Sequence, residues 1–227
     1  MDKKRSGKIL VVILICAADI LWAAGLIYFW KDKNILISVR KASFNLPGIF
    51  IQNLAVNLPT VILLIIMLVI LRKNFAEELY FKITGRWQKA LVVVFLIALT
   101  GITLFCLVTK EDKVTILYNL LYYVIFIGFT EEFVVRDVCT WFLRNEQGIV
   151  RYLVPNLAFA AMHLFSYASW GKITVPYVLT FVTTDMIGLV CVGCALQSLK
   201  EKSGTIWLSV LLHGLADYLV VLHYPVG

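Results

Sequence analysis

Charged residues are scarce in this chain: they make up 15% of its 227 residues, whereas soluble domains carry about 25%. Hydrophobic residues make up 61%, and the mean hydropathy is +0.87. This composition excludes an ordinary soluble domain and predicts an integral membrane protein. The apolar runs approach 20 residues and do not alternate with polar ones, so the expected spans are helices rather than barrel strands.

The sequence also lacks internal repeats, low-complexity linkers and a recognisable cleavage site for a signal peptide. Its first apolar run is too long for a signal peptide and predicts a true span. We therefore expect one domain, residues 1–227, that folds as an all-α polytopic bundle. The longest polar connection, residues 72–89, is expected to hold a short interfacial helix over residues 75–81. The sequence predicts about seven membrane spans, at residues 9–30, 48–71, 90–108, 115–143, 152–168, 174–199 and 205–223.

Cysteine and histidine are few, with five and three residues. All five cysteines fall inside apolar stretches, which argues against a disulfide framework. Cys191 and Cys194 are spaced as a CxxC pair in the middle of a span. Small residues at a helix–helix contact explain that spacing better than a redox or metal site does.

The net charge of +7 comes from basic residues in short loops, a pattern that orients membrane proteins and does not suggest nucleic-acid binding. With a cytoplasmic N-terminus, the inside segments hold 13 Lys and Arg residues and the outside segments hold 7. We therefore expect the N-terminus to be cytoplasmic.

The most informative segment lies inside the fourth apolar run, where Glu131, Glu132, Arg136 and Asp137 interrupt almost wholly apolar sequence. Each ionisable side chain at membrane depth costs roughly 2.5–3.5 kcal/mol, so such groups need partners and usually mark a functional site. Glu132 and Arg136 stand four residues apart on one helical face and are expected to pair. Glu131 points about 100° away and is available for another task.

Two further segments place ionisable groups in apolar sequence. His163 follows Phe159 by one helical turn in the fifth run, and His213 precedes Asp217 by one turn in the seventh. At 1.5 Å rise per residue, Glu131, His163 and His213 lie roughly 20, 18 and 14 Å from the predicted cytoplasmic span ends. Matched depth in three spans predicts one shared cavity inside the membrane, opening toward the cytoplasmic side.

A carboxylate and two imidazoles at one site fit the chemistry of water activation. They can remove a proton from water directly, or hold a metal ion that lowers the pKa of its bound water. Catalytic zinc takes three protein ligands and a water, and Glu131, His163 and His213 would supply three. The residues leave open whether a cofactor such as zinc or another divalent metal is used.

Each group also has a purely structural interpretation. Glu132 and Arg136 alone would make an ion pair in a bundle core, and His163 alone would be a core histidine bonded to its surroundings. His213 and Asp217 would make an ordinary interhelical pair. The three together at matched depth favour catalysis. Two other intramembrane acids, Asp19 and Asp185, have no assigned role, although Asp185 fits either packing or support of a site histidine.

The ordered motifs Glu131-Glu132-x-x-x-Arg136, Phe159-x-x-x-His163 and His213-x-x-x-Asp217 resemble the three signatures of the CPBP family. That family comprises the CAAX prenyl endopeptidases and the bacteriocin-processing or bacteriocin-immunity (Abi) membrane proteins. The resemblance covers residues 115–222, the motif-bearing core, whereas the N-terminal spans in residues 9–108 carry no motif of the family.

The resemblance implies an intramembrane endopeptidase, glutamate-dependent or a metalloprotease, in which Glu131 and His163 activate the attacking water. His213, with residue 217, would stabilise the oxyanion, and Glu132 with Arg136 would hold the site together or position substrate. The family often has Asn where this chain has Asp217. An ionised Asp cannot donate a hydrogen bond, so Asp217 is protonated, orients His213 or helps to bind a metal.

The resemblance further implies a membrane-associated peptide or protein as substrate, a lipid bilayer as surroundings and no nucleic acid as partner. The short N-terminal half is more similar to bacterial members, in the cytoplasmic membrane, where self-immunity, peptide-signal processing or CAAX-type cleavage are the expected settings. The alternative is a non-proteolytic membrane partner or regulator of a sensor kinase that keeps the motifs as a structural core. Transport is less favoured because no repeat is present.

Overall fold

The computed structural model describes residues 3–71, 83–167 and 173–223, and in these ranges the chain is helical and contains no strand. The expected interfacial helix at residues 75–81 lies outside the described residues. The helices of the first half are α1 (Lys3–Asp32), the short 3₁₀-helix η1 (Val39–Phe44), α2 (Leu46–Val56), α3 (Leu58–Leu71) and α5 (Arg86–Thr109).

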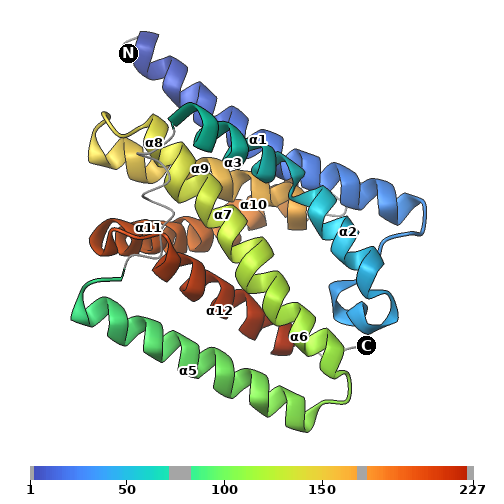
Figure 1. Cartoon of the computed structure of the whole chain (residues 1–227). Helices are drawn as coiled ribbons and strands as arrows, with labels where there is room; N and C mark the ends of the chain where they lie inside the picture. The colour runs from blue at the N-terminus through green and yellow to red at the C-terminus, as the bar shows by residue number, and fades with distance from the viewer. Residues whose placement is uncertain (1–2, 72–82, 168–172, 224–227) are drawn as a thin grey trace.

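The second half contains one long helical segment of changing geometry, followed by the helices that complete the bundle (Figure 1). The long segment is α6 (Lys113–Leu121), η2 (Tyr122–Phe129), α7 (Thr130–Glu132), η3 (Phe133–Cys139) and α8 (Thr140–Phe142). The rest is α9 (Gly148–Tyr167), α10 (Val175–Thr183), α11 (Asp185–Ser203) and α12 (Trp207–His223).

Five of these helical segments are long and apolar enough to cross a membrane, by length and composition, within the described part of the chain. A sixth span forms if α2 and α3, bent by 55° where they meet, are counted as one. The apolar segment Trp207–Leu222 of α12 is shorter. The all-helical membrane architecture expected from the sequence is confirmed, and the count of seven stays a prediction that requires α12 to cross as well.

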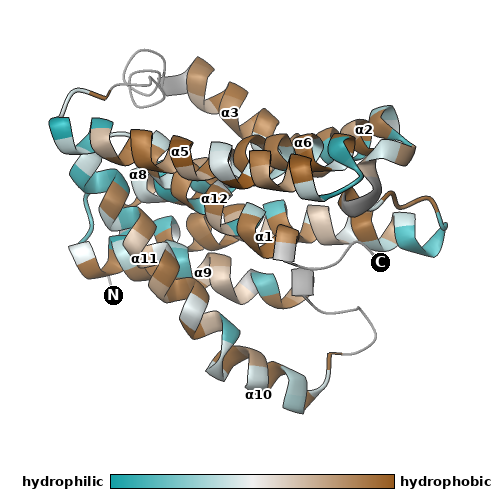
Figure 2. Cartoon of the chain, turned by 90° about the horizontal axis from the view of Figure 1, so that it is seen from below, coloured by the Kyte–Doolittle hydropathy of each residue, from teal (hydrophilic) through white to brown (hydrophobic). Residues whose placement is uncertain are grey.

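Large apolar side chains cover much of the outer surface of the bundle. Leu14, Ile51, Val69, Ile97 and Phe105 are each more than half exposed. Hydrophobic residues run along the helices, while hydrophilic residues gather at helix ends and connections (Figure 2). Lipid would cover this surface in a membrane, because exposed apolar side chains of this density are otherwise an aggregation hazard.

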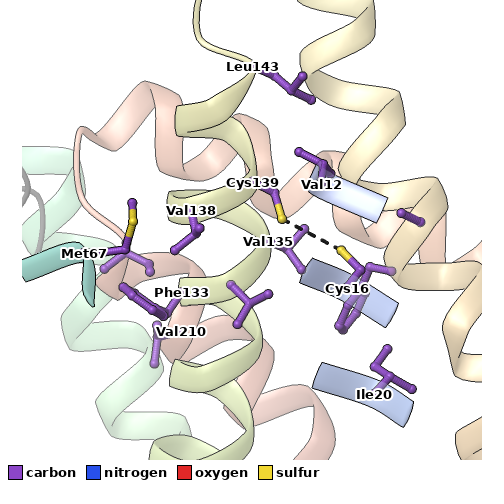
Figure 3. Packing of buried hydrophobic residues seen from close by; sticks show 14 residues of the cluster. Val12, Cys16, Ile20, Met67, Phe133, Val135, Val138, Cys139, Leu143 and Val210 are labelled. Atoms are coloured by element: carbon purple, nitrogen blue, oxygen red, sulfur yellow. Dashed lines mark hydrogen bonds between the residues drawn. The ribbon is translucent and has the colours of Figure 1, made fainter. Parts of the chain in front are cut away.

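The apolar core lies where α1 and α9 pack against η3 and the beginning of α12. Figure 3 shows Cys16 of α1 facing Cys139 of η3, with a sulfur–sulfur distance of 3.8 Å. Around them lie fully buried residues such as Val12, Val135 and Val138. The core therefore fixes the helix that carries the two glutamates against the N-terminal helix.

The two wide-turned segments η2 and η3 are π-helical and flank α7, the turn that contains both glutamates. Each ends immediately before a threonine. The Thr130 hydroxyl donates to the carbonyl oxygens of Phe126 and Ile127, and the Thr140 hydroxyl to those of Arg136 and Asp137. Such back-bonding satisfies carbonyl oxygens inside a helix whose regular ladder is disturbed. π-Helical turns are rare and often accompany functional sites.

Two glycines allow η2 and α12 to approach each other closely. A Cβ atom on Gly214 would lie 2.7 Å from the Val124 Cα atom, and one on Gly128 would lie 3.0 Å from the Val210 carbonyl oxygen. Small residues at such crossings let helix backbones pack tightly in membranes. Because Gly214 follows His213, this approach sets how far His213 lies from Glu131.

Basic and acidic side chains join several segments at one end of the bundle. Lys8 of α1 pairs with Glu146 before α9 at 2.6 Å, and Arg151 of α9 pairs with Glu201 of α11 at 3.2 Å. These pairs join the N-terminal helix to the connection before α9, and the beginning of α9 to the end of α11, three regions that the sequence predicts to be cytoplasmic.

We expect Gly214→Ala to lower stability by about 1–3 kcal/mol, because the added methyl group overpacks a backbone contact that cannot yield without moving α12. Melting temperature in detergent is the measurement. Gly101→Ala is the matched control, because nothing lies within 4 Å of its Cβ position. Equal melting temperatures for the two variants would contradict the close approach of η2 and α12.

Candidate active site

A cavity of about 370 Å³ lies among the helices and is bordered by six segments of the chain. Glu131, His163, His213 and Asp217, all proposed from the sequence, line this one cavity. They come from α7, α9 and α12, which are separated by long stretches of sequence. The structure therefore brings together the residues that the depth estimate placed at a common level.

Glu132 lies behind the cavity wall, in the centre of a buried charge network. Its side chain has no exposed surface, and its Oε2 lies 3.3 Å from Arg136 Nε. Its Oε1 lies 2.8 Å from His213 Nδ1. The expected pairing of Glu132 with Arg136 is present, and the contact with His213 adds a link between α7 and α12.

Three carboxyl groups surround the His213 imidazole. Its Nδ1 meets Glu132, and its Nε2 lies 3.6 Å from Glu131 Oε2 and 3.5 Å from Asp217 Oδ2. Because Glu132 is an acceptor when ionised, Nδ1 must carry a hydrogen and donate it. The second nitrogen is the one that lies on the cavity side, between Glu131 and Asp217.

His163 is oriented by its own helix. Its Nδ1 lies 2.9 Å from the carbonyl oxygen of Phe159, which can only accept, so the hydrogen is on Nδ1 in the neutral ring. The rings of Phe159 and His163 meet edge to face, with centroids 4.3 Å apart. Nε2 therefore carries the lone pair that is able to take a proton.

A second buried ion pair joins the helical segment that carries the glutamates to α11. Lys200 of α11 lies 3.0 Å from Asp137 Oδ1 and donates to the carbonyl oxygen of Arg136 at 3.3 Å. Asp137, like Glu132, is wholly buried. The four charges of the sequence cluster are thus divided: Glu132, Arg136 and Asp137 are held in buried ion pairs, whereas Glu131 lines the cavity and pairs with neither Arg136 nor Lys200.

The proposed metal ligands do not form a metal site in the described residues. No group of three or more His, Cys, Asp or Glu side chains there is arranged so that it could hold a metal ion. Both histidines bond through Nδ1, to Glu132 and to a backbone carbonyl respectively, an arrangement that leaves Nε2 as the nitrogen available to a metal. The donor set expected from Glu131, His163 and His213 is not arranged as such a group in this structure, and a metal-assisted reaction stays a prediction.

Several residues that line the cavity have no role predicted from the sequence. Asp19 reaches it from α1, Asn57 from the junction of α2 and α3, and Tyr122 from η2. The sequence identifies Asp19 as an intramembrane acid. It does not show which helices pack against α1, so it could not place Asp19 at the cavity. Asp185, considered as support for a histidine, is exposed at the beginning of α11 and does not line the cavity.

Residues 113–219 match the protein-family model described as type II CAAX prenyl endopeptidase, Rce1-like. The matched segment begins with α6, ends within α12 and contains all six residues proposed for the site. It agrees with the segment that resembles CPBP proteins. No curated protein and no solved structure matches the chain.

We expect Arg136→Ala to destabilise the protein by about 3–5 kcal/mol, since it leaves the buried Glu132 carboxylate without its cation. Thermal unfolding in detergent, followed by circular dichroism, measures the loss. Arg144→Ala serves as a control, because Arg144 is an exposed cation that rests on the ring of Trp141. A melting temperature for Arg136→Ala as high as that of the control would contradict the network.

Proposed function

Because residues 113–219 of this chain belong to the Rce1-like family of type II CAAX prenyl endopeptidases, we propose that the protein is an intramembrane endopeptidase. It hydrolyses a peptide bond in a membrane-associated peptide or protein. The observation that carries the proposal is the convergence of Glu131, His163, His213 and Asp217 on one cavity, from three separate helices of an apolar bundle.

Glu131 and His163 are proposed to activate the attacking water. Glu131 lies close to the cavity and outside the Glu132–Arg136 ion pair, so its carboxylate is available to accept a proton. His163 Nε2 is a second acceptor at the same cavity, and its tautomer is fixed by the bond from Nδ1 to Phe159. A general base positioned in this way contributes about 10²–10⁴-fold to the rate.

His213 and Asp217 are proposed to stabilise the oxyanion of the tetrahedral intermediate. A protonated Nε2 of His213, facing the cavity beside Asp217, is a donor directed at developing negative charge. Such preorganised donors act strongly where water is excluded. Asp217 joins this role as a second donor while it carries a proton.

Glu132 and Arg136 are proposed to position these groups and not to react. Glu132 holds His213 Nδ1 at 2.8 Å, while Arg136 balances the Glu132 charge. This division supports the interpretation of two adjacent glutamates as one base and one structural partner, which follows the rule that different surroundings give two carboxylates different tasks.

The proposed orientation places the N-terminus in the cytoplasm. The basic N-terminal segment meets the connection before α9 through the pair of Lys8 with Glu146, and the sequence predicts both to be cytoplasmic. A bacterial cytoplasmic membrane fits this charge bias. Self-immunity, peptide-signal processing and CAAX-type cleavage stay predictions within the proposed activity.

We expect Glu131→Gln and His163→Ala each to abolish peptide cleavage while the protein still accumulates in membranes. Both changes remove a proton acceptor from the cavity and leave the Glu132–Arg136 pair intact. Cleavage of membrane-anchored reporter peptides, followed by mass spectrometry, is the measurement. Asp185→Asn, an exposed acid on α11, is the control and should keep full activity. Wild-type cleavage by either site variant would refute water activation by these residues.

We expect Asp217→Asn to retain activity and to extend it to higher pH, whereas Asp217→Leu loses it. Asp217 donates only while protonated, but an Asn amide donates at every pH. The measurement is a pH–activity profile of wild type and both variants, with and without a chelator. Strong impairment of Asp217→Asn at every pH would instead assign Asp217 to orienting His213 as an anion. Loss of wild-type activity on chelation would show a metal requirement.

A further inference from the structure

One wall of the cavity comes from the N-terminal part of the chain, outside residues 113–219 that match the family. Asp19 of α1 and Asn57 at the junction of α2 and α3 are the polar residues of this wall. Neither has a role in the proposed hydrolysis. An acid retained at membrane depth is costly unless it has a partner or a function.

Asp19 uses only part of its hydrogen-bonding capacity within the described residues. Its Oδ1 accepts a hydrogen bond of 2.8 Å from the Thr60 hydroxyl, and Thr60 is itself buried. Among the described residues, its Oδ2 has no hydrogen-bond partner and no cation within ion-pair distance. One carboxylate oxygen is therefore fixed by α3, while the other remains an acceptor in a residue that lines the cavity.

Asn57 presents a second acceptor on the same wall. Its side chain lies where the chain bends by 55° between α2 and α3. Its Nδ2 donates to the carbonyl oxygen of Asn53 at 2.8 Å, an assignment that cannot be reversed because a carbonyl oxygen does not donate. Asn57 is 8% exposed and lines the cavity, and its Oδ1 makes no hydrogen bond with the described residues.

Two features hold the bend at Asn57 in place, a proline after it and a hydrogen bond from α1. Pro59 follows it, and proline has no N–H to continue the helical ladder. From α1, the indole Nε1 of Trp22 donates to the carbonyl oxygen of Ala55 at 2.9 Å. Trp22 lies one helical turn after Asp19, so α1 fixes the bend and supplies the carboxylate in the same region.

The balance of charge in the cavity favours a cation as the missing partner. Glu131 and Asp217 lie 3.6 and 3.5 Å from His213 Nε2, so these two lining acids already face a basic group, whereas Asp19 has no basic side chain at ion-pair distance in the described lining. Arg136 is already paired with Glu132. Two unused acceptors, one of them a carboxylate, match the donors of an ammonium or guanidinium group.

We propose that Asp19 Oδ2 and Asn57 Oδ1 bind the basic side chain of a substrate, a lysine or arginine near the scissile bond. The inference rests on the proposed peptidase activity and assigns to the N-terminal helices the selection of substrate. In a cavity with little water, a carboxylate discriminates strongly between a charged and a neutral side chain, because a desolvated charge needs its partner.

The test uses membrane-anchored peptides in which a single lysine is moved through the positions around the scissile bond. Each peptide is paired with its acetyl-lysine counterpart, which has nearly the same shape and no charge. We expect wild-type kcat/KM to favour lysine by at least about tenfold at one position. Asp19→Asn, which keeps the size and the acceptor for Thr60, should lose this preference by slower cleavage of the lysine peptide alone.

Two controls separate selection from folding. Asp185→Asn removes an exposed negative charge from α11 and should preserve the preference for lysine. Asn57→Leu should weaken cleavage of the lysine peptide more than that of the acetylated one. Melting temperatures in detergent show whether any variant is simply unstable; if Asp19→Asn is, Asp19→Glu is tested in its place and should keep the preference for lysine.

Binding of the lysine and acetyl-lysine peptides to the Glu131→Gln variant tests the inference even if no cleavage is observed. If the lysine peptide binds more tightly than the acetylated one, and Asp19→Asn in the same background removes the difference, the cation site is supported. Equal binding of both peptides overturns it, as does an equal effect of Asp19→Asn on both. Absence of cleavage by wild type together with selective binding would refute the peptidase and leave the cation site standing.

Discussion

The buried Glu132 carboxylate is the group on which the site depends. It has no exposed surface, and it is bonded to Arg136 of the following turn and to His213 of a distant helix. A charge in an apolar bundle cannot be left without partners, so these contacts must form together with the fold. The same contacts set the ring of His213 between Glu131 and Asp217. Stability and the geometry of the cavity therefore follow from one network.

The irregular helix around the glutamates lets two adjacent acids perform different tasks. The π-helical segments η2 and η3 enclose the single turn that carries Glu131 and Glu132, and Thr130 and Thr140 satisfy carbonyl oxygens where each segment ends. Gly128 and Gly214 then admit α12 to within backbone contact. Were the helices further apart, a histidine side chain could not reach both glutamates, because its ring spans only a few ångströms.

Helical spacing and depth predicted that Glu131, His163 and His213 share one cavity, since both depend only on the regular rise and turn of a helix, but they did not predict Asp19 or Asn57. Glu132 with Arg136, and the shared level of Glu131, His163 and His213, follow from that regularity. The contact of His213 with Glu132 did not follow, because it depends on how α7 and α12 cross. Likewise, the bend at Asn57 and the break between α10 and α11 at Thr184 depend on packing. The expected metal ligands do not gather into a metal-type group among the described residues for the same reason, because spacing along one helix does not set the distances between side chains on different helices.

The position of Asp19 separates the chemistry of the cavity from its selectivity. The groups proposed to react all belong to the segment that matches the peptidase family, and their mutual contacts leave little freedom to vary them. Asp19 and Asn57 touch none of that network through a hydrogen bond in the described residues; their bonds are to Thr60 and Asn53. A substitution on this wall changes which side chain the cavity accepts without removing a base or an oxyanion donor. The N-terminal half carries no family motif. This is expected of a part that contacts the substrate, because its residues must be free to change when substrates differ, while the reacting groups stay fixed.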